Sequence, residues 1–203
     1  GAMIEPLAVA VHGVKQMGDV KGMNIAVLGA GPIGNLVAQA AKGMGAAKVM
    51  ITDVSDLRLK KAQECGIDVC VNTKNKDFGE VMVEAFGPDK ADVIYDCAGN
   101  NITMGQAIKY ARKGSVIVLV AVFAGMAEID LAVANDHELD IKSTMMYRHD
   151  DYVDGIKLVN EGKVHLRPLI SKTFAFKDYL EAYHYIDDNR ETTMKVIINV
   201  QEK

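Results

Sequence analysis

Three glycines and one aspartate have the types and spacing that could do chemistry in this chain. Gly29, Gly31 and Gly34 follow an apolar run, and Asp53 ends the next apolar run, 19 residues after Gly34. Gly29 would permit a tight turn, Gly31 a close approach of the backbone to a diphosphate, and Gly34 close packing of a helix on the strand. An acid at this distance can accept hydrogen bonds from the ribose hydroxyls of adenosine. The pattern predicts a dinucleotide site, with the phosphates at the start of the helix.

The alternatives to this interpretation are weaker. Asp53 could cap a helix or lie in a solvated loop, but the glycine spacing favours the ribose, and its charge repels a 2′-phosphate, which favours NAD over NADP. A methyltransferase could also hold an adenosyl ribose with such an acid, although Pro32 in the turn argues against that class. A short-chain dehydrogenase needs a Tyr-x-x-x-Lys pair, and none of the seven tyrosines is followed by lysine at the fourth position.

The elements that must position these residues alternate between helix and strand. The unbroken apolar run 116–124 predicts a strand buried on both faces, as in a parallel sheet. Short connections then indicate a doubly wound α/β domain of the Rossmann type, whose ligands bind at the carboxyl ends of the strands. The expected helices cover residues 6–17, 33–44, 56–65, 78–85 and 102–112, and the expected strands 25–29, 48–53, 69–71, 93–97 and 115–122.

After Gly125 the pattern loosens. We expect a strand over 139–146 and a helix over 152–160, capped by Asp150 or Asp151. A segment with a separate pattern of elements follows, in which strands over 169–176 and 194–200 flank a helix over 178–186. The predicted division is a dinucleotide-binding domain at 1–166 and a C-terminal segment at 167–203.

The composition narrows the class of protein. The chain has 203 residues, of which 49% are hydrophobic and 25% charged, which suits one globular domain with an appended segment. Its net charge of −4 and the absence of a basic patch argue against a nucleic-acid partner, and no apolar run is long enough to span a membrane. Three cysteines without metal-type spacing predict reduced thiols and a cytoplasmic location.

The ordered set of motifs resembles the zinc-dependent medium-chain alcohol and polyol dehydrogenases, most closely their sorbitol (L-iditol) dehydrogenase branch. The resemblance covers nearly all of the chain. It rests on the motifs Ile4-Glu5-Pro6, Gly29-Ala30-Gly31-Pro32-Ile33-Gly34, Thr52-Asp53 with Arg58, Asp96-Cys97-Ala98-Gly99, and Asp140-Ile141-Lys142 with Tyr147.

The resemblance implies an oxidoreductase that uses NAD and zinc to transfer a hydride between NAD and a polyol or other secondary alcohol. Such enzymes carry a GroES-like catalytic domain that holds the zinc. This sequence has no Gly-His-Glu segment of the zinc-holding type, and its one Cys-Gly-x-Asp tetrapeptide, at 65–68, is expected to end a helix. We therefore expect the NAD-binding part of a longer enzyme, inactive alone, whose tail packs on the missing domain. The alternative is a stand-alone NAD-binding or sensing module.

The resemblance also implies roles for individual residues, none of them catalytic. Arg58 could lie near the adenosine or be an exposed helix charge, and Cys97 is expected to be a small buried hydrophobe. Glu5 matches a position in or next to the zinc shell of the intact enzyme, although one carboxylate cannot hold zinc. The expected cofactor-binding residues are Gly29, Gly31, Pro32, Ile33, Gly34, Asp53, Arg58, Cys97, Ala98, Gly99, Val120 and Val122.

Two further expectations follow from the same resemblance. Met146 stands where sorbitol dehydrogenases usually have an arginine that arranges the substrate side of the cleft, which puts sorbitol itself in doubt, although Arg148 could substitute for it. The strand over 139–146 should lie at the sheet edge and pair with a second copy, giving a homodimer or homotetramer.

Overall fold

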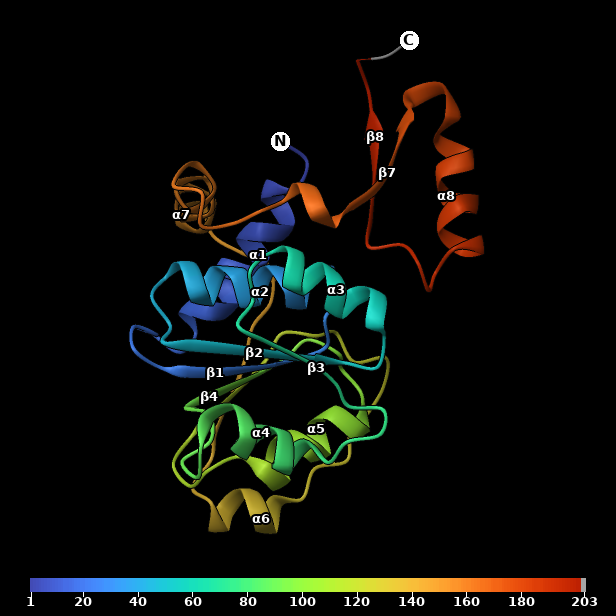
Figure 1. The fold of residues 1–203 in the computed structure, drawn as a ribbon. Coiled ribbons are helices and arrows are strands. Elements are labelled where there is room, and N and C mark those ends of the chain that lie inside the picture. The colour runs from blue at the N-terminus through green and yellow to red at the C-terminus, as the bar shows by residue number, and fades with distance from the viewer. Residues whose placement is uncertain (202–203) are drawn as a thin grey trace.

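The chain folds around a six-stranded parallel sheet between two layers of helices (Figure 1). This computed structural model describes residues 1–201. The strands lie in the order β3-β2-β1-β4-β5-β6, so the direction in which the chain adds strands reverses between β1 and β4. Their bounds are β1 Asn24–Leu28, β2 Lys48–Asp53, β3 Val69–Asn72, β4 Val93–Asp96, β5 Val116–Leu119 and β6 Asp140–Ser143. The predicted doubly wound α/β fold is confirmed.

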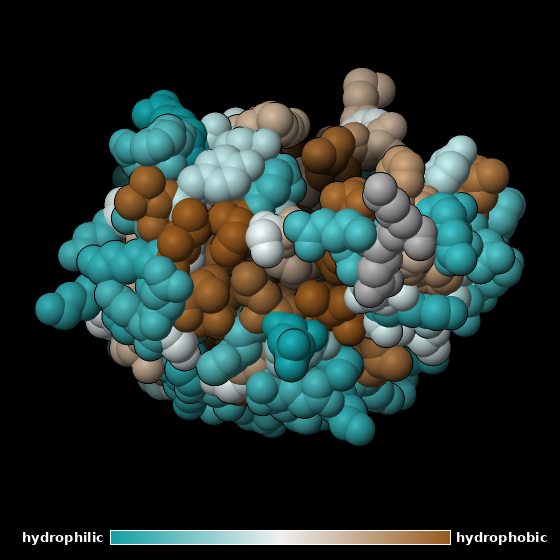
Figure 2. Space-filling view, turned by 90° about the horizontal axis from the view of Figure 1, so that it is seen from above, coloured by the Kyte–Doolittle hydropathy of each residue, from teal (hydrophilic) through white to brown (hydrophobic). Residues whose placement is uncertain are grey.

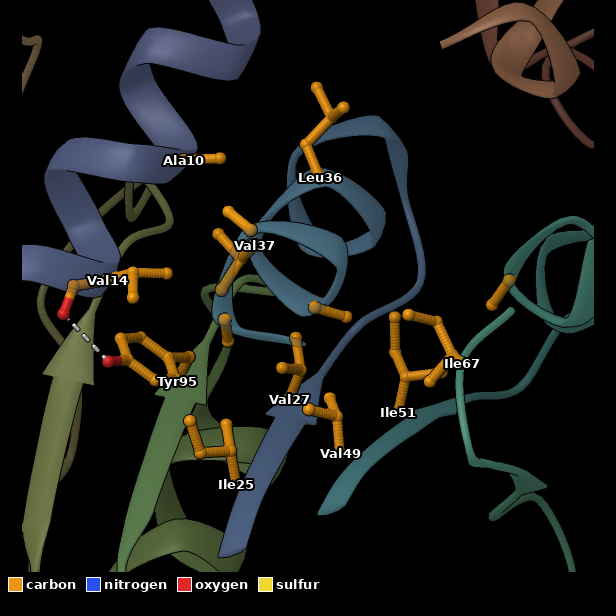
Figure 3. Close-up of a cluster of buried hydrophobic side chains, with 14 of the residues drawn as sticks. Ala10, Val14, Ile25, Val27, Leu36, Val37, Val49, Ile51, Ile67 and Tyr95 are labelled. Atoms are coloured by element: carbon orange, nitrogen blue, oxygen red, sulfur yellow. Dashed lines mark hydrogen bonds between the residues drawn. The ribbon is translucent and has the colours of Figure 1, made fainter. Parts of the chain in front are cut away.

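Apolar side chains cover both faces of this sheet, because successive side chains along each strand point into two different cores. Ile25 and Val27 of β1 point into one core, and Ala26 and Leu28 into the other. The first core also takes Tyr95 of β4, whose buried hydroxyl donates a 3.0 Å hydrogen bond to the carbonyl of Val14 (Figure 3). Burial on both sides explains why the strands read as unbroken apolar runs.

The helices divide between the two faces of the sheet (Figure 1). The first layer contains α1 Ile4–Lys15, α2 Pro32–Gly43, α3 Asp56–Glu64 and α7 His149–Asn160. The second contains α4 Phe78–Phe86, α5 Asn101–Tyr110 and α6 Leu131–Asp136. No helix in the described part of the chain combines the length and the apolar character needed to cross a bilayer.

The C-terminal segment forms a small unit beyond the first helix layer, on the side of α3 (Figure 1). A 3₁₀ turn, η1 Arg167–Leu169, leads into β7 Ile170–Ala175, which pairs in parallel with β8 Lys195–Asn199. Between these strands lie η2 Phe176–Asp178 and α8 Tyr179–Asp188. This unit exposes apolar side chains, among them Phe176, Leu180 and Tyr183. Seen from the top of Figure 1, a patch of apolar residues interrupts the hydrophilic surface (Figure 2).

Several predicted boundaries are wrong, each for a local reason. Strand β5 ends at Leu119, not at residue 122. The N–H of Ala121 donates to the carbonyl of Asp96, which already accepts the ladder bond of Val120, so the ladder does not continue. Strand β6 covers four residues instead of the eight of 139–146. Helix α6 was not expected; Asp130 caps it by accepting a 3.1 Å bond from the N–H of Val133.

The cap of α7 agrees with the prediction in part: Asp151 contributes to it, but from within the helix. Asp151 does not precede the helix but lies in its first turn, and its carboxylate accepts a 2.7 Å hydrogen bond from the N–H of Arg148. Arg148 is therefore the N-cap residue, and α7 begins at His149. Helix α1 likewise begins at Ile4, two residues before Pro6, which is compatible with proline in a first turn.

Candidate functional site

A cavity of about 310 Å3 opens at the carboxyl ends of β1, β2 and β4, where the strand order reverses. Crevices at this point are the usual ligand sites of open α/β sheets. Six of the predicted residues line it: Gly29, Gly31, Asp53, Arg58, Cys97 and Ala98. The structure thus brings the glycine turn and the acid of the second strand to one cavity.

Two glycines of the turn are required by the fold itself. Gly29 has a φ of +93°, in the left-handed region that favours glycine. A Cβ on Gly34 would lie 1.9 Å from the carbonyl oxygen of Gly29. That distance is far inside van der Waals contact, so only glycine lets α2 begin directly against the end of β1.

Gly31 differs from both, because the fold does not require glycine there. Its φ of −62° and ψ of 180° are open to any residue. A Cβ built on Gly31 would meet no protein atom within 4 Å, and the residue faces the cavity. What the missing side chain provides is open space beside the start of α2.

The start of α2 is equipped to hold an anion. Gly31 is its N-cap and has no side chain to accept the first free N–H groups. Pro32 takes the first helical position, where its missing N–H is no loss. The N–H groups of Ile33 and Gly34 then lack intrahelical partners by the geometry of any α-helix, and the positive end of the helix dipole lies at the cavity.

Asp53 is buried at the end of β2 and fixes the loops around the cavity. Its Oδ2 accepts a 2.7 Å hydrogen bond from the N–H of Ala30, and its Oδ1 accepts one of 2.9 Å from the N–H of Ser55. The guanidinium of Arg58 lies 3.8 Å from Oδ2. A carboxylate has about four lone-pair sites, so Asp53 can still accept from a ligand hydroxyl.

A second cavity, of about 400 Å3, shares Cys97 and Ala98 with the first. Its lining includes the predicted Ile33, Val120 and Val122. Apart from the hydroxyl of Thr144, the side chains around it are apolar or a thiol. The two cavities together form an elongated site with a polar half and an apolar half, which suits a ligand with the same division.

Packing and backbone conformation account for two of the predicted cofactor-binding residues, Gly99 and Cys97. Gly99 lines neither cavity; its φ is +69°, and a Cβ on it would lie 2.7 Å from the Cβ of Ala121. Cys97 is half-buried between the two cavities. Burial, with a smaller contribution from the charge of Asp96, raises the pKa of its thiol far above its ordinary value, which favours the neutral thiol over the nucleophilic thiolate.

Glu5 lies exposed in the first turn of α1, close to Tyr147. The neighbouring Tyr152 and, to a smaller extent, Glu5 raise the pKa of Tyr147 to about 12. Within residues 1–201 no three His, Cys, Asp or Glu side chains gather where a metal could bind. Cys65, in the Cys-Gly-x-Asp tetrapeptide, is buried, and its thiol donates to the carbonyl of His165. The described residues therefore do not by themselves fit zinc, which takes about four ligands.

Several lining residues were missed at the sequence level. The first cavity also contains Thr52, Val54, Thr73, Asn100, Thr103 and Gln106, and the second Val9, Ala121, Thr144, Met145 and Met146. Thr73 directly follows β3, and Asn100 is the N-cap residue of α5; both positions were usable signals. For Thr103 and Gln106, on α5, no sequence signal was available. Met146 lines the second cavity, whereas Arg148 lines neither cavity.

Comparison with known proteins gives consistent matches. Residues 32–161 match the family model described as zinc-binding dehydrogenase. The chain is 32% identical to sorbitol dehydrogenase 1 of Saccharomyces cerevisiae over 204 residues, covering 98% of this chain and 57% of that protein. The structure resembles L-idonate 5-dehydrogenase of Escherichia coli, with a TM-score of 0.88, 29% identity, and 98% of this chain matched to 56% of that one.

An alcohol dehydrogenase of Escherichia coli, solved in complex with the cofactor NADH, has a TM-score of 0.84 and 29% identity, and its match covers 96% of this chain and 57% of that one. The chain thus spans little more than half the length of the relatives it matches.

Proposed function

The chain belongs to the zinc-binding dehydrogenase family, and from this premise we propose that it is the NAD(H)-binding part of an oxidoreductase acting on a polyol or other secondary alcohol. The single observation that carries this proposal is Gly31. The fold does not need glycine there, yet the missing side chain leaves open space beside free helix N–H groups. A diphosphate is the group that such a site suits.

The two cavities support an assignment of each half of the dinucleotide. The adenosine ribose would bind to Asp53, the diphosphate to the N–H groups at the start of α2, and the nicotinamide would occupy the apolar cavity of Ile33, Val120 and Val122. When bound, the nicotinamide accepts a hydride from an alcohol carbon or returns it to a carbonyl. The residues of this chain orient that ring and shield it from water.

The substrate class is proposed from the relatives that this chain resembles, a sorbitol dehydrogenase and an idonate dehydrogenase. Zinc enters the proposal only through the family. The one carboxylate that matches a position in or next to its shell is Glu5, which lies exposed in the first turn of α1. The residues described here do not fit the metal by themselves, so we assign no step to it. No residue of this chain is assigned as general acid or base.

Three other expectations stay proposals. The exposed Phe176, Leu180 and Tyr183 support a segment from residue 167 that packs on another part of a longer enzyme, in preference to a stand-alone sensing module. The position of β6 at the sheet edge supports pairing with a second copy. Three free cysteines support a reducing, cytoplasmic location.

The Gly31→Ala variant tests the proposed function. We expect the variant to keep the stability of the wild type, because its new methyl group meets no protein atom. Its dissociation constant for NADH should rise about tenfold or more, which corresponds to about 1.4 kcal/mol of binding free energy. NADH titration followed by nicotinamide fluorescence measures the change, and urea unfolding measures stability.

Gly125→Ala is the matched control for this test, because Gly125 also has open space around it and lines neither cavity. It should bind NADH as the wild type does. Equal affinity of Gly31→Ala and Gly125→Ala would contradict the diphosphate assignment, and a wild-type chain that does not bind NADH at all would contradict the proposed function.

The charge of Asp53 predicts the preference between the two nicotinamide dinucleotides. The wild-type chain should bind NADH at least about tenfold more tightly than NADPH, because the 2′-phosphate would approach a buried carboxylate. Competition of NADPH against bound NADH gives the ratio directly. Equal affinities would remove Asp53 from the ribose site while leaving the diphosphate assignment in place.

A further inference from the structure

Gln106, on α5, brings to the first cavity a carboxamide that the proposed function does not use. Its side chain is half-buried and lines that cavity. The side-chain hydrogen bonds of α5 and its cap all involve Asn100, Asn101, Thr103 or Tyr110. Within residues 1–201, the amide of Gln106 therefore has no hydrogen-bond partner.

The fold alone gives no reason for an amide at this position. A carboxamide has two N–H donors and an acceptor oxygen, and hiding part of it from water without a partner costs free energy. Alanine would avoid that cost and has the higher helix propensity. Asn100, the other amide of the lining, differs, because its oxygen accepts from the N–H groups of Ile102 and Thr103 and so caps α5.

The side of α5 that carries Gln106 faces the segment that follows β3. Residues three and four apart share one side of a helix, so Thr103, Gln106 and Tyr110 lie in one row. The hydroxyl of Tyr110 donates a 2.6 Å hydrogen bond to Asp77, which precedes α4. Thr73, which directly follows β3, lines the first cavity together with Thr103 and Gln106.

The order of the strands places Thr73 beyond the proposed ribose site. The glycine turn follows β1, Asp53 ends β2, and Thr73 follows β3, and these strands are successive neighbours in the sheet. The N–H of Thr73 donates a 3.1 Å hydrogen bond to the carbonyl of Asp53. In a dinucleotide the base is attached at C1′ of the ribose and the diphosphate at C5′, at opposite ends of the sugar. With the diphosphate at α2 and the ribose at Asp53, the base extends toward Thr73 and Gln106.

We propose that Gln106 is a specificity-determining residue whose carboxamide binds the adenine base. A carboxamide can form two hydrogen bonds with adenine, because its oxygen accepts from the 6-amino group while its N–H donates to the adjacent ring nitrogen. Arg58 also lines the cavity, but a guanidinium has no acceptor for that amino group. The inference rests on the proposed binding of NAD(H) and adds to it the group that recognises the base.

The test measures two ligands on two proteins by calorimetry. NAD+ is compared with its etheno analogue, in which a bridge between N1 and N6 of adenine removes the amino hydrogens. The proteins are the wild type and Gln106→Leu, which keeps much of the side-chain volume but has neither donor nor acceptor. We expect Gln106→Leu to bind NAD+ about tenfold more weakly than the wild type does, and the analogue within about threefold.

Gln63→Leu is the matched control, because Gln63 is exposed on α3 and lines neither cavity. It should change neither dissociation constant. Urea unfolding should give both variants the midpoint of the wild type. If Gln106→Leu does not fold, Gln106→Ala removes the same amide without filling its place and is expected to show the same selective loss of NAD+ binding.

Other results would overturn the inference in distinguishable ways. An equal loss for NAD+ and the analogue would make Gln106 only a wall of the cavity, and an unchanged affinity for NAD+ would remove it from the site. A wild-type chain that binds the two ligands equally refutes this inference and leaves the proposed function in place. A wild-type chain that binds neither refutes the proposed function, and this inference with it.

Discussion

A Gly34→Ala variant is expected to lose both stability and NADH binding. The added Cβ would lie 1.9 Å from the carbonyl oxygen of Gly29 and 3.0 Å from its carbonyl carbon. Both are backbone atoms at the end of a central strand, so no flexible side chain can move aside. The start of α2 must shift, and overpacking of this kind costs about 3 kcal/mol of unfolding free energy or more. The shift also moves the N–H groups that would hold the diphosphate.

Two measurements on the purified chain check this result. Urea unfolding followed by circular dichroism should show a midpoint well below that of the wild type, and NADH titration should show no saturable binding. Gly105→Ala is the control for adding a methyl group to a helix, since Gly105 lies in α5 with nothing within 4 Å of its Cβ position. Unchanged stability of Gly34→Ala would mean that the turn adopts another conformation.

Gly31→Ala and Gly34→Ala together separate two roles that the sequence motif combines. The spacing predicted a different role for each glycine. The structure shows that these roles depend on different surroundings of the two residues. Gly34 is needed by the protein, because its neighbours leave no room. Glycine at position 31 is needed only for a bound ligand, because no protein atom lies near the position of its missing Cβ. The Gly34→Ala variant should therefore fail in folding, and the Gly31→Ala variant only in binding.

The parts of the fold that were predictable are those with a local cause. The glycine turn and the acid that ends β2 are each determined by a few consecutive residues. The parallel sheet was predicted from strands that are apolar at every position, because such strands are buried on both faces.

The parts that were missed depend on contacts between distant segments. Strand β5 stops early because the carbonyl of Asp96, on the neighbouring strand, accepts two N–H groups from it. Thr73 and Gln106 meet Gly31 at one cavity only because the strand order places β3 and α5 on either side of the turn. The burial of Asp96 is of the same kind, since an acid after an apolar strand can equally lie in solvent.

A contact between two helices far apart in the sequence gives the second large effect. Asp151, on α7, is 2% exposed, and its Oδ2 lies 2.8 Å from Nδ1 of His12 on α1. Lys15, one turn further along α1, donates a 2.9 Å hydrogen bond to Oδ1. The same carboxylate accepts from the N–H of Arg148, so one side chain both caps α7 and joins it to α1.

Asp151→Ala should lower the free energy of unfolding by about 3 kcal/mol, because it removes the cap and leaves the partners of a buried charge unpaired. Asp150→Ala is the matched control: Asp150 is the preceding residue in the same helix turn, yet its side chain is 89% exposed. That control should change stability by less than about 0.5 kcal/mol. Urea unfolding of both variants at neutral pH gives the comparison, and similar losses would show that the contact with α1 contributes nothing.

The pH dependence of this loss follows from the environment of the carboxyl group. Burial alone would raise the pKa of Asp151, but hydrogen bonds from Lys15, Arg148 and His12, together with the charge of Lys15, outweigh it and hold the pKa below its ordinary value. A carboxyl whose pKa is lower in the folded state stabilises the protein above its unfolded pKa of about 4, and this contribution disappears as the pH falls through the folded value. The difference in unfolding free energy between wild type and Asp151→Asn should therefore be constant from about pH 7 to pH 5 and shrink below about pH 4. A difference that grows on acidification would show that the carboxylate is destabilised by its surroundings and that its bonds to α1 do not compensate for its burial.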